Sequence, residues 1–186
     1  MWAEDGAVRV HTIGGGEPVG LCGSGLLDAL AAYLELGAID ETGAIGGEYL
    51  ALAPAVRLTR ADIRAAQLAK GAVAAGIEML LRTARTELDQ ISALYIAGGF
   101  GGHMDMRSAV RIGLIPAELG HKARFLGNAA LAGAERLLLD RSCLPEIRRI
   151  AAAARPVDLG GDPAFNERFI DHLYFSDCFF GAEGED

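Results

Sequence analysis

Cysteine is scarce in this chain of 186 residues: the three that occur, Cys22, Cys143 and Cys178, lie far apart with no Cys-x-x-Cys pair. Three scattered cysteines cannot by themselves supply the four ligands of a zinc or iron–sulfur site, and an odd number is unlike a disulfide framework. Sparse, unpaired cysteine is typical of a reducing compartment, so we expect a cytoplasmic location.

Long apolar runs and clustered basic residues are also lacking. No uninterrupted apolar run reaches the length of a membrane span, and the N-terminus has no basic stretch followed by an apolar core. The chain carries 17 Lys and Arg against 25 Asp and Glu, a formal net charge of −8. A nucleic-acid surface requires clustered basic side chains, so we expect neither nucleic acid nor membrane as a partner.

Aromatic residues make up only 6% of the chain, although 51% of it is apolar. Alanine and glycine must therefore do much of the packing, which favours closely approaching helices and sheet. Strand-like and helical segments alternate, and this alternation predicts an α/β fold of one domain or of two small lobes.

The motifs of nucleophilic, metal-dependent and paired-carboxylate catalysis are absent. There is no Ser–His–Asp order and no His-Glu-x-x-His, and the four histidines share no ligand-like spacing. We therefore assign no catalytic residue and no metal ligand. His103 is expected to be an exposed loop residue, and His172 a surface or packing residue.

The most informative segment is 94–103, in which a strand-like run enters four glycines set around Phe100. Glycine leaves backbone amides uncovered and permits positive φ, and N–H groups at the start of a helix attract anions. The turn therefore either binds a phosphate-bearing ligand or is glycine-rich only for close packing of a strand against a helix. Its spacing matches neither the dinucleotide-binding motif nor the P-loop.

A second glycine-rich turn, 20–25, precedes an apolar helical pattern over 26–34. Ser24 is the expected N-cap of that helix, and Gly37 stands where it should end. Close packing of the helix start against a strand is the simpler explanation for these glycines.

A long helix is predicted after Thr59, where Asp62 completes a capping-box pattern. Two polar residues, Gln67 and Lys70, fall inside its apolar stripe. Such a lysine either extends its aliphatic stem toward solvent or points at a negative group. The other expected strands are 8–12, 49–52, 122–126 and 156–159. The other expected helices are 106–112, 129–139, one capped by Ser142, and an amphipathic segment opened by Asp162 and Pro163.

Five motifs occur in order along the chain: 20–28, 62–64 with 67–72, 95–101, 112–116, and 125–134. Together they closely resemble the C-terminal part of the reductive activators of corrinoid proteins, and 162–165 with Phe169 fits the ending of that family. Those activators are ATP-dependent iron–sulfur proteins that return inactive Co(II) corrinoid to Co(I) in methyltransferase systems.

The resemblance implies the C-terminal portion of an actin/Hsp70/sugar-kinase-like (ribonuclease H-like) α/β fold, with a long helix and a mixed sheet. It divides the chain into a glycine-rich entry and helix (1–58), the long helix (59–92) and an adenosine-loop subdomain (93–186). The phosphate-binding Asp-x-Gly-Thr hairpins of the family are missing from this sequence, and hydrolysis requires carboxylates that hold Mg²⁺ near the phosphates. We therefore expect a fragment that hydrolyses ATP poorly alone.

The resemblance also assigns the site residues. It gives an adenosine role to Gly98, Gly99, Phe100 and Gly101, and it brings Gln67 and Lys70 near the purine. The implied cofactors are ATP or ADP with Mg²⁺, bound weakly by this chain, and a 2Fe–2S cluster held only by an absent N-terminal region. The implied partner is a corrinoid protein. A sheet without its early strands exposes an edge, so a homo-oligomer is expected.

Two alternatives remain open. The chain could belong to the activator of another low-potential enzyme, such as a 2-hydroxyacyl-CoA dehydratase, although its cysteines do not show the arrangement those activators use. It could also be a degenerate, nucleotide-free interaction module.

Overall fold

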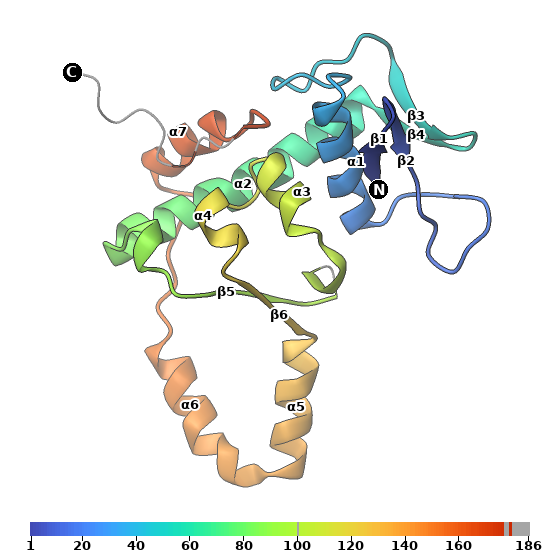
Figure 1. Cartoon of the computed structure of the whole chain (residues 1–186). Helices are drawn as coiled ribbons and strands as arrows, with labels where there is room; N and C mark the ends of the chain where they lie inside the picture. The colour runs from blue at the N-terminus through green and yellow to red at the C-terminus, as the bar shows by residue number, and fades with distance from the viewer. Residues whose placement is uncertain (100, 177–178, 180–186) are drawn as a thin grey trace.

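Helix α2 (Arg60–Ala84) is the longest element and runs through the middle of the fold (Figure 1). The computed structural model describes residues 1–99, 101–176 and 179. The capping box at the start of α2 is present: Asp62 N donates to Thr59 Oγ1 at 3.2 Å, and Thr59 N donates to Asp62 Oδ2 at 2.9 Å. The side-chain bond also lowers the pKa of Asp62. The predicted start of the long helix after Thr59 is therefore confirmed, and the helix ends at Ala84, before the end of the segment 59–92 assigned to it.

The strands form three two-stranded sheets in the described part of the chain. The antiparallel pairs are β1 (Trp2–Glu4) with β2 (Ala7–Arg9), and β3 (Tyr49–Ala53) with β4 (Val56–Thr59). The parallel pair is β5 (Leu94–Ala97) with β6 (Ala123–Gly127). Strand pairing of both orientations beside the helices makes the fold mixed α/β, as predicted.

The core lies between α1 (Gly23–Glu35), α2 and α3 (Met106–Arg111). Fully buried members come from all three helices and from the C-terminal region: Leu30, Ile63, Ala109, Ile112 and Phe175. A short helix, α4 (Ala117–Gly120), follows α3 and leads into β6. One-turn 3₁₀ helices lie at Leu88–Gln90 (η1) and Gly101–His103 (η2).

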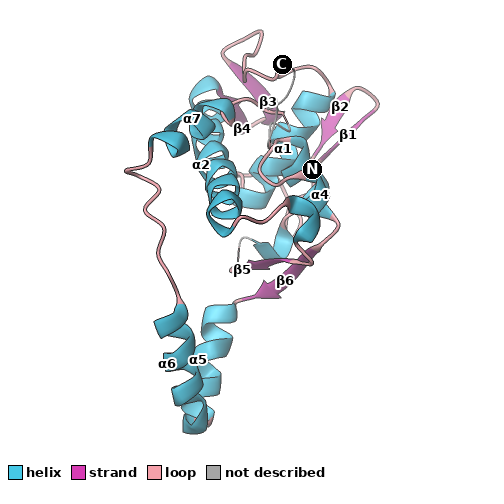
Figure 2. Cartoon of the chain, turned by 90° about the vertical axis from the view of Figure 1, so that its left-hand side faces the viewer, coloured by secondary structure: helices cyan, strands magenta, loops and turns pink. Residues whose placement is uncertain are grey.

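A hairpin of two helices projects away from this body (Figures 1 and 2). It consists of α5 (Ala129–Leu139), the one-turn helix η3 (Arg141–Cys143) and α6 (Leu144–Ala153). We call residues 129–153 the arm. A connecting segment then returns the chain to the body, where α7 (Pro163–Asp171) packs on α2.

The residues after α7 form a strap across α2. We call His172–Ser176 the C-terminal strap. Its backbone is anchored where Phe175 N donates to Glu41 O at 2.8 Å. It also passes close to two glycines, because a Cβ on Gly71 would lie 3.1 Å from His172 O and one on Gly113 would collide with Ser176 O. Glycine is therefore required at 113, whereas a Cβ at 71 would require the strap to shift by only a few tenths of an ångström.

Several predicted details are wrong. Residues 156–159 form no strand, since they run in the extended connection from the arm to α7 without a pairing partner. Cys22 rather than Ser24 caps α1, and Ser142 lies inside η3, where Asp140 accepts from its backbone N–H. Strands β1 and β4 were not predicted. No described helix combines the length and the apolar character that a bilayer span requires.

Candidate functional site

The shape of the turn after β5 depends on the backbone conformation of Gly98. Gly98 adopts φ +100°, which side-chain-bearing residues rarely adopt, and its N–H donates to Gly127 O at 2.7 Å. Gly99 follows, exposed to solvent. Gly101 begins η2, and Asp105 then caps α3 by accepting from Arg107 N at 2.8 Å. Phe100, which was also assigned to this turn, lies outside the described residues.

The space in front of these glycines is free of described protein atoms. A Cβ built on Gly98, Gly99 or Gly102 would meet no atom within 4 Å. Close packing within the described chain therefore does not require glycine at these positions. At Gly98 the backbone conformation requires it, and at Gly99 neither packing nor a positive φ does.

The second glycine-rich turn and His103, the last residue of the first glycine-rich segment, line one cavity. A hollow of about 460 Å³ is lined by the second turn through Gly20, Cys22 and Gly25, and by His103, which ends η2. This volume falls within the range of small-molecule sites, roughly 300–1,000 Å³. The turns are separate motifs in the sequence, whereas the fold brings His103, at the end of the first, to the cavity that the second lines.

Cys22 lies at the rim of this cavity with its thiol directed at the start of α1. Its Sγ accepts from Gly25 N at 3.3 Å and lies 3.3 Å from Ser24 Oγ. These two hydrogen bonds, the Ser24 contact first, lower the pKa of the Cys22 thiol below its ordinary value. The start of α1 is thus a polar end of the cavity.

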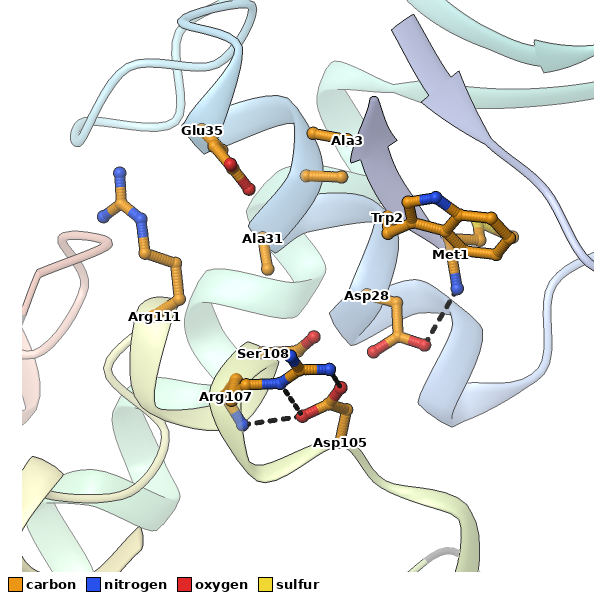
Figure 3. Close-up of a pocket in the computed structure, with 11 residues that line it drawn as sticks. Met1, Trp2, Ala3, Asp28, Ala31, Glu35, Asp105, Arg107, Ser108 and Arg111 are labelled. Atoms are coloured by element: carbon orange, nitrogen blue, oxygen red, sulfur yellow. Dashed lines mark hydrogen bonds and ion pairs between the residues drawn. The ribbon is translucent and has the colours of Figure 1, made fainter. Parts of the chain in front are cut away.

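Asp28 lines both that cavity and a neighbouring one, which Figure 3 shows. The neighbour measures about 550 Å³ and lies between α1, which supplies Asp28 and Glu35, and α3, which supplies Arg107 and Arg111. Asp28 Oδ2 accepts from the Met1 ammonium at 3.2 Å. Its other oxygen, Oδ1, is buried and has no hydrogen-bond partner. An acceptor buried without a donor is unfavourable, so Asp28 is suited to receive a hydroxyl or amide donor from a ligand.

Asp105 and Arg107 form an ion pair on the α3 side of the same region, as Figure 3 shows. Arg107 Nη2 lies 2.8 Å from Asp105 Oδ2, and Nε lies 3.2 Å from Oδ1. The guanidinium lowers the pKa of Asp105, so this carboxylate stays ionised. The pair fixes the start of α3 next to the glycine turn.

Gln67 and Lys70 are engaged elsewhere. Gln67 is buried, and its Nε2 donates to Thr42 O at 2.9 Å and to Leu173 O at 2.8 Å. Lys70 is also buried; its Nζ donates to Gly113 O at 3.5 Å and to Tyr174 O. Both side chains therefore hold the C-terminal strap in this structure, and neither lines the 460 Å³ cavity.

Sequence reasoning missed Asp28, Glu78 and Arg168. Asp28 interrupts the apolar pattern of α1 much as Lys70 interrupts that of α2, so the same signal could have found it. Glu78 is fully buried, with Arg168 Nε at 3.4 Å and His172 Nε2 at 2.9 Å from its two oxygens. Within residues 1–99, 101–176 and 179, no group of three His, Cys, Asp or Glu side chains could hold a metal ion.

Comparisons with known proteins agree with one another. Residues 2–180 match the family model described as the C-terminal domain of RACo, the ASKHA domain. The chain is 29% identical over 202 residues to the corrinoid activation enzyme RamQ of Eubacterium limosum, covering 94% of this chain and 34% of that protein.

Two further relatives have related names. The Co(II) methylated amine-specific corrinoid protein reductase of Methanosarcina barkeri is 31% identical over 137 residues, which cover 74% of this chain and 25% of that protein. Among solved structures, a reductive activator for corrinoid, iron-sulfur protein superposes with a TM-score of 0.84 at 31% identity, covering 94% of this chain and 31% of the other.

The chain thus spans about a third of the length of RamQ and of the solved activator, and a quarter of the reductase. The match extends over nearly all of its own residues, so it concerns the whole described fold rather than one motif. This chain belongs to the family of the C-terminal ASKHA domain of RACo, the family of the corrinoid activation enzymes.

Proposed function

We propose that this chain supplies the adenosine side of the nucleotide site in an ATP-dependent activator that returns Co(II) corrinoid protein to Co(I). The observation that carries the proposal is the turn 98–99, which no described atom covers, together with His103, which follows it and lines a cavity with the second glycine-rich turn. The relatives are named as activators or reductases of corrinoid proteins, and these names support the choice of reaction.

The residues present fit a nucleoside. Amides near Gly99 are not covered by side chains and can approach a ligand closely, while the buried Oδ1 of Asp28 offers an acceptor for a hydroxyl or amino group. Bound ATP would supply binding energy that differs between two states of the activator complex, and only such a difference can bias them. We assign no hydrolytic step to this chain, and we expect its affinity for nucleotide to be weak.

Gln67 and Lys70 have an indirect role in this proposal. They hold the C-terminal strap at Leu173 and Tyr174, and Lys70 also holds Gly113 at the end of α3. The start of α3 follows the glycine turn directly. A change at either side chain would therefore reach the nucleotide site through the packing of α3, even without direct contact to the purine.

The remaining parts of the proposal concern partners and location. The partner is a corrinoid protein of a methyltransferase system, the electron comes from an iron–sulfur cluster outside this chain, and the chain self-associates. A reducing cytoplasm suits Cys22 and Cys143, which are both free thiols.

Calorimetric titration with ATP tests the nucleotide site, comparing the unaltered chain with Gly99→Val. A Cβ at position 99 meets no described atom, and the backbone there does not require glycine. A valine side chain would, however, occupy the space in which we propose that the ligand binds. We expect affinity to fall by about tenfold or more, ~1.4 kcal/mol.

Gly46→Val is the matched control, since a Cβ at Gly46 also meets nothing within 4 Å and the residue lies outside both cavities. Equal affinity in the two variants would contradict the adenosine assignment. Absence of any nucleotide binding would favour the interaction-module alternative.

A further inference from the structure

The C-terminal strap lies across α2 and against the end of α3. Phe175, within the strap, is fully buried and belongs to the same apolar cluster as Ala109 and Ile112. Ala109 lies on α3, and Ile112 is the C-cap residue of that helix. The strap is therefore part of the packing that fixes α3 in the fold.

One lysine joins α2, the end of α3 and the strap. Lys70 Nζ, on α2, donates to Gly113 O at 3.5 Å and to Tyr174 O. Gly113 directly follows the C-cap of α3 and has φ +71°, and a Cβ there would collide with Ser176 O. The backbone of the strap thus lies against both the long helix and the end of α3, so the strap cannot leave without freeing α3 on that side.

Helix α3 depends on such contacts for its position. It has six residues, and isolated helices shorter than about 12–15 residues are marginal in water. Its N-cap, Asp105, follows η2, whose last residue His103 lines the cavity of about 460 Å³. Six residues rise only about 9 Å along a helix axis, so a movement at the strap end of α3 reaches the glycine turn over a short distance.

The strap has a buried root and a separate anchor farther along. At the root, His172 Nε2 lies 2.9 Å from Glu78 Oε2, which keeps the end of α7 on α2. Beyond the root the backbone lies outside helices and strands, and Phe175 N donates to Glu41 O at 2.8 Å. Proteins open locally in units of this size at a lower free energy than that of global unfolding. The strap can therefore open by itself while α7 stays in place.

We infer that the C-terminal strap is a latch with an attached and a released state, and that it acts through α3 on the glycine turn, residues 98–99 with η2. In the attached state Lys70 holds Gly113, and α3 keeps His103 at the cavity; in the released state α3 and the turn both loosen. A ligand that binds only the ordered turn favours attachment, and attachment raises the affinity of the turn for that ligand by the same factor. The link to a nucleotide rests on the function proposed above, whereas the link between strap and turn does not.

Residue-resolved hydrogen exchange of the 186-residue chain tests the coupling, with ADP as the ligand. The amide of Phe175 reports attachment, because it donates to Glu41 O. We expect saturating ADP to slow its exchange about fivefold or more, the lower end of typical coupling between two sites. The matched control is the amide of Ala154, which donates to Ile150 O at the end of the arm and should not change. Unchanged exchange at Phe175 in the presence of bound ADP would overturn the latch.

A measurement without nucleotide separates the latch from the proposed function. If ADP does not bind, the proposed function fails, and hydrogen exchange in increasing urea without ligand then decides on the latch. The amide of Ala109 donates to Asp105 O at 3.0 Å at the start of α3. It should open together with the amide of Phe175, with the same free energy and the same dependence on urea. Opening of Phe175 while Ala109 stays protected would overturn the latch.

Phe175→Ala gives an independent check. Loss of the buried ring weakens attachment, so the amides of Gly98 and His103 should shift in the 15N spectrum of the chain without ADP. Tyr174→Ala is the matched control, since it removes a half-exposed ring and keeps the carbonyl that Lys70 binds; those amides should not move. Equal shifts in both variants, or in neither, would contradict the latch. If Phe175→Ala does not fold, the exchange of the unaltered chain decides.

Discussion

His172 Nε2 lies 2.9 Å from Glu78 Oε2, and both side chains are fully buried between α7 and α2. The pair joins two residues 94 positions apart in the chain. Arg168 and Arg82 approach the other oxygen of Glu78 at 3.4 and 3.3 Å. The C-terminal region is therefore attached to the long helix by a buried polar cluster as well as by apolar packing.

This cluster predicts a loss of stability in mild acid. Burial lowers the pKa of His172 below 6.5, and this effect exceeds the opposing influence of Glu78 and Asp171; Lys70 lowers it further. The unfolded chain therefore binds more protons than the folded one once the pH falls through 6.5. The contribution to stability is complete above that pH and is lost toward the folded-state pKa.

Urea unfolding between pH 7.5 and about 5 checks this. The unfolding free energy of the unaltered chain should fall with pH more steeply than that of His172→Gln. The carboxylates of Asp40, Asp62 and Asp105 have lowered pKa values and remain ionised in this window. Parallel pH profiles for the two proteins would show that His172 does not titrate as argued.

Glu78→Ala should be among the most destabilising substitutions in the chain. It removes the buried carboxylate that Arg168, Arg82 and His172 share, and removing one partner of a buried ion pair costs about 3–5 kcal/mol. Glu167→Ala, an exposed carboxylate on α7, should change the unfolding free energy by no more than about 0.5 kcal/mol. Thermal or urea unfolding measures both changes. Similar changes in unfolding free energy for the two variants would contradict the stabilising role of the buried cluster around Glu78.

Lys70→Met tests, in the absence of nucleotide, whether Lys70 stabilises the C-terminal strap. The carbonyls of Gly113 and Tyr174 lose their donor, and an unsatisfied buried group costs about 1–3 kcal/mol. Arg64→Met, on the exposed face of the same helix, is the control. Limited proteolysis should cleave the C-terminal region faster in the Lys70 variant. Unchanged stability and cleavage would leave Lys70 free for a direct role at the purine.

Gly113→Ala should dislodge the strap from its other side. Gly113 has φ +71°, and a Cβ there collides with Ser176 O, so both backbone strain and a clash oppose the substitution. A residue forced into such a conformation costs about 1–3 kcal/mol. Gly46→Ala, which meets no atom, should be neutral in the same unfolding assay. An equally stable Gly113 variant would mean that the strap can move aside at little cost.

Local signals predicted the helices well. Thr59 with Asp62, and the apolar spacing behind them, correctly placed the start of α2. The residues 129–139 were predicted as a helix and form α5. Hairpin strands were harder: β1 and β4 have only three and four residues, and a strand that short has no periodicity to recognise.

Long-range polar contacts could not be predicted from the sequence. Gln67 and Lys70 were recognised as polar residues in an apolar stripe, but their bonds to the backbone of 173 and 174 depend on how the chain returns after the arm. The position of His103 at the cavity lined by the turn 20–25 depends in the same way on the packing of α1 beside α3. The adenosine role of the turn 98–101 stays a prediction.

Backbone NMR of the 15N-labelled chain during titration with ADP tests the central claim most directly, because it locates weak binding residue by residue. We predict that the largest shifts fall on the amides of Gly98, Gly99 and 101–103, followed by those of the turn 20–25 across the cavity. Shifts concentrated elsewhere, with these amides unmoved at saturation, would contradict the account.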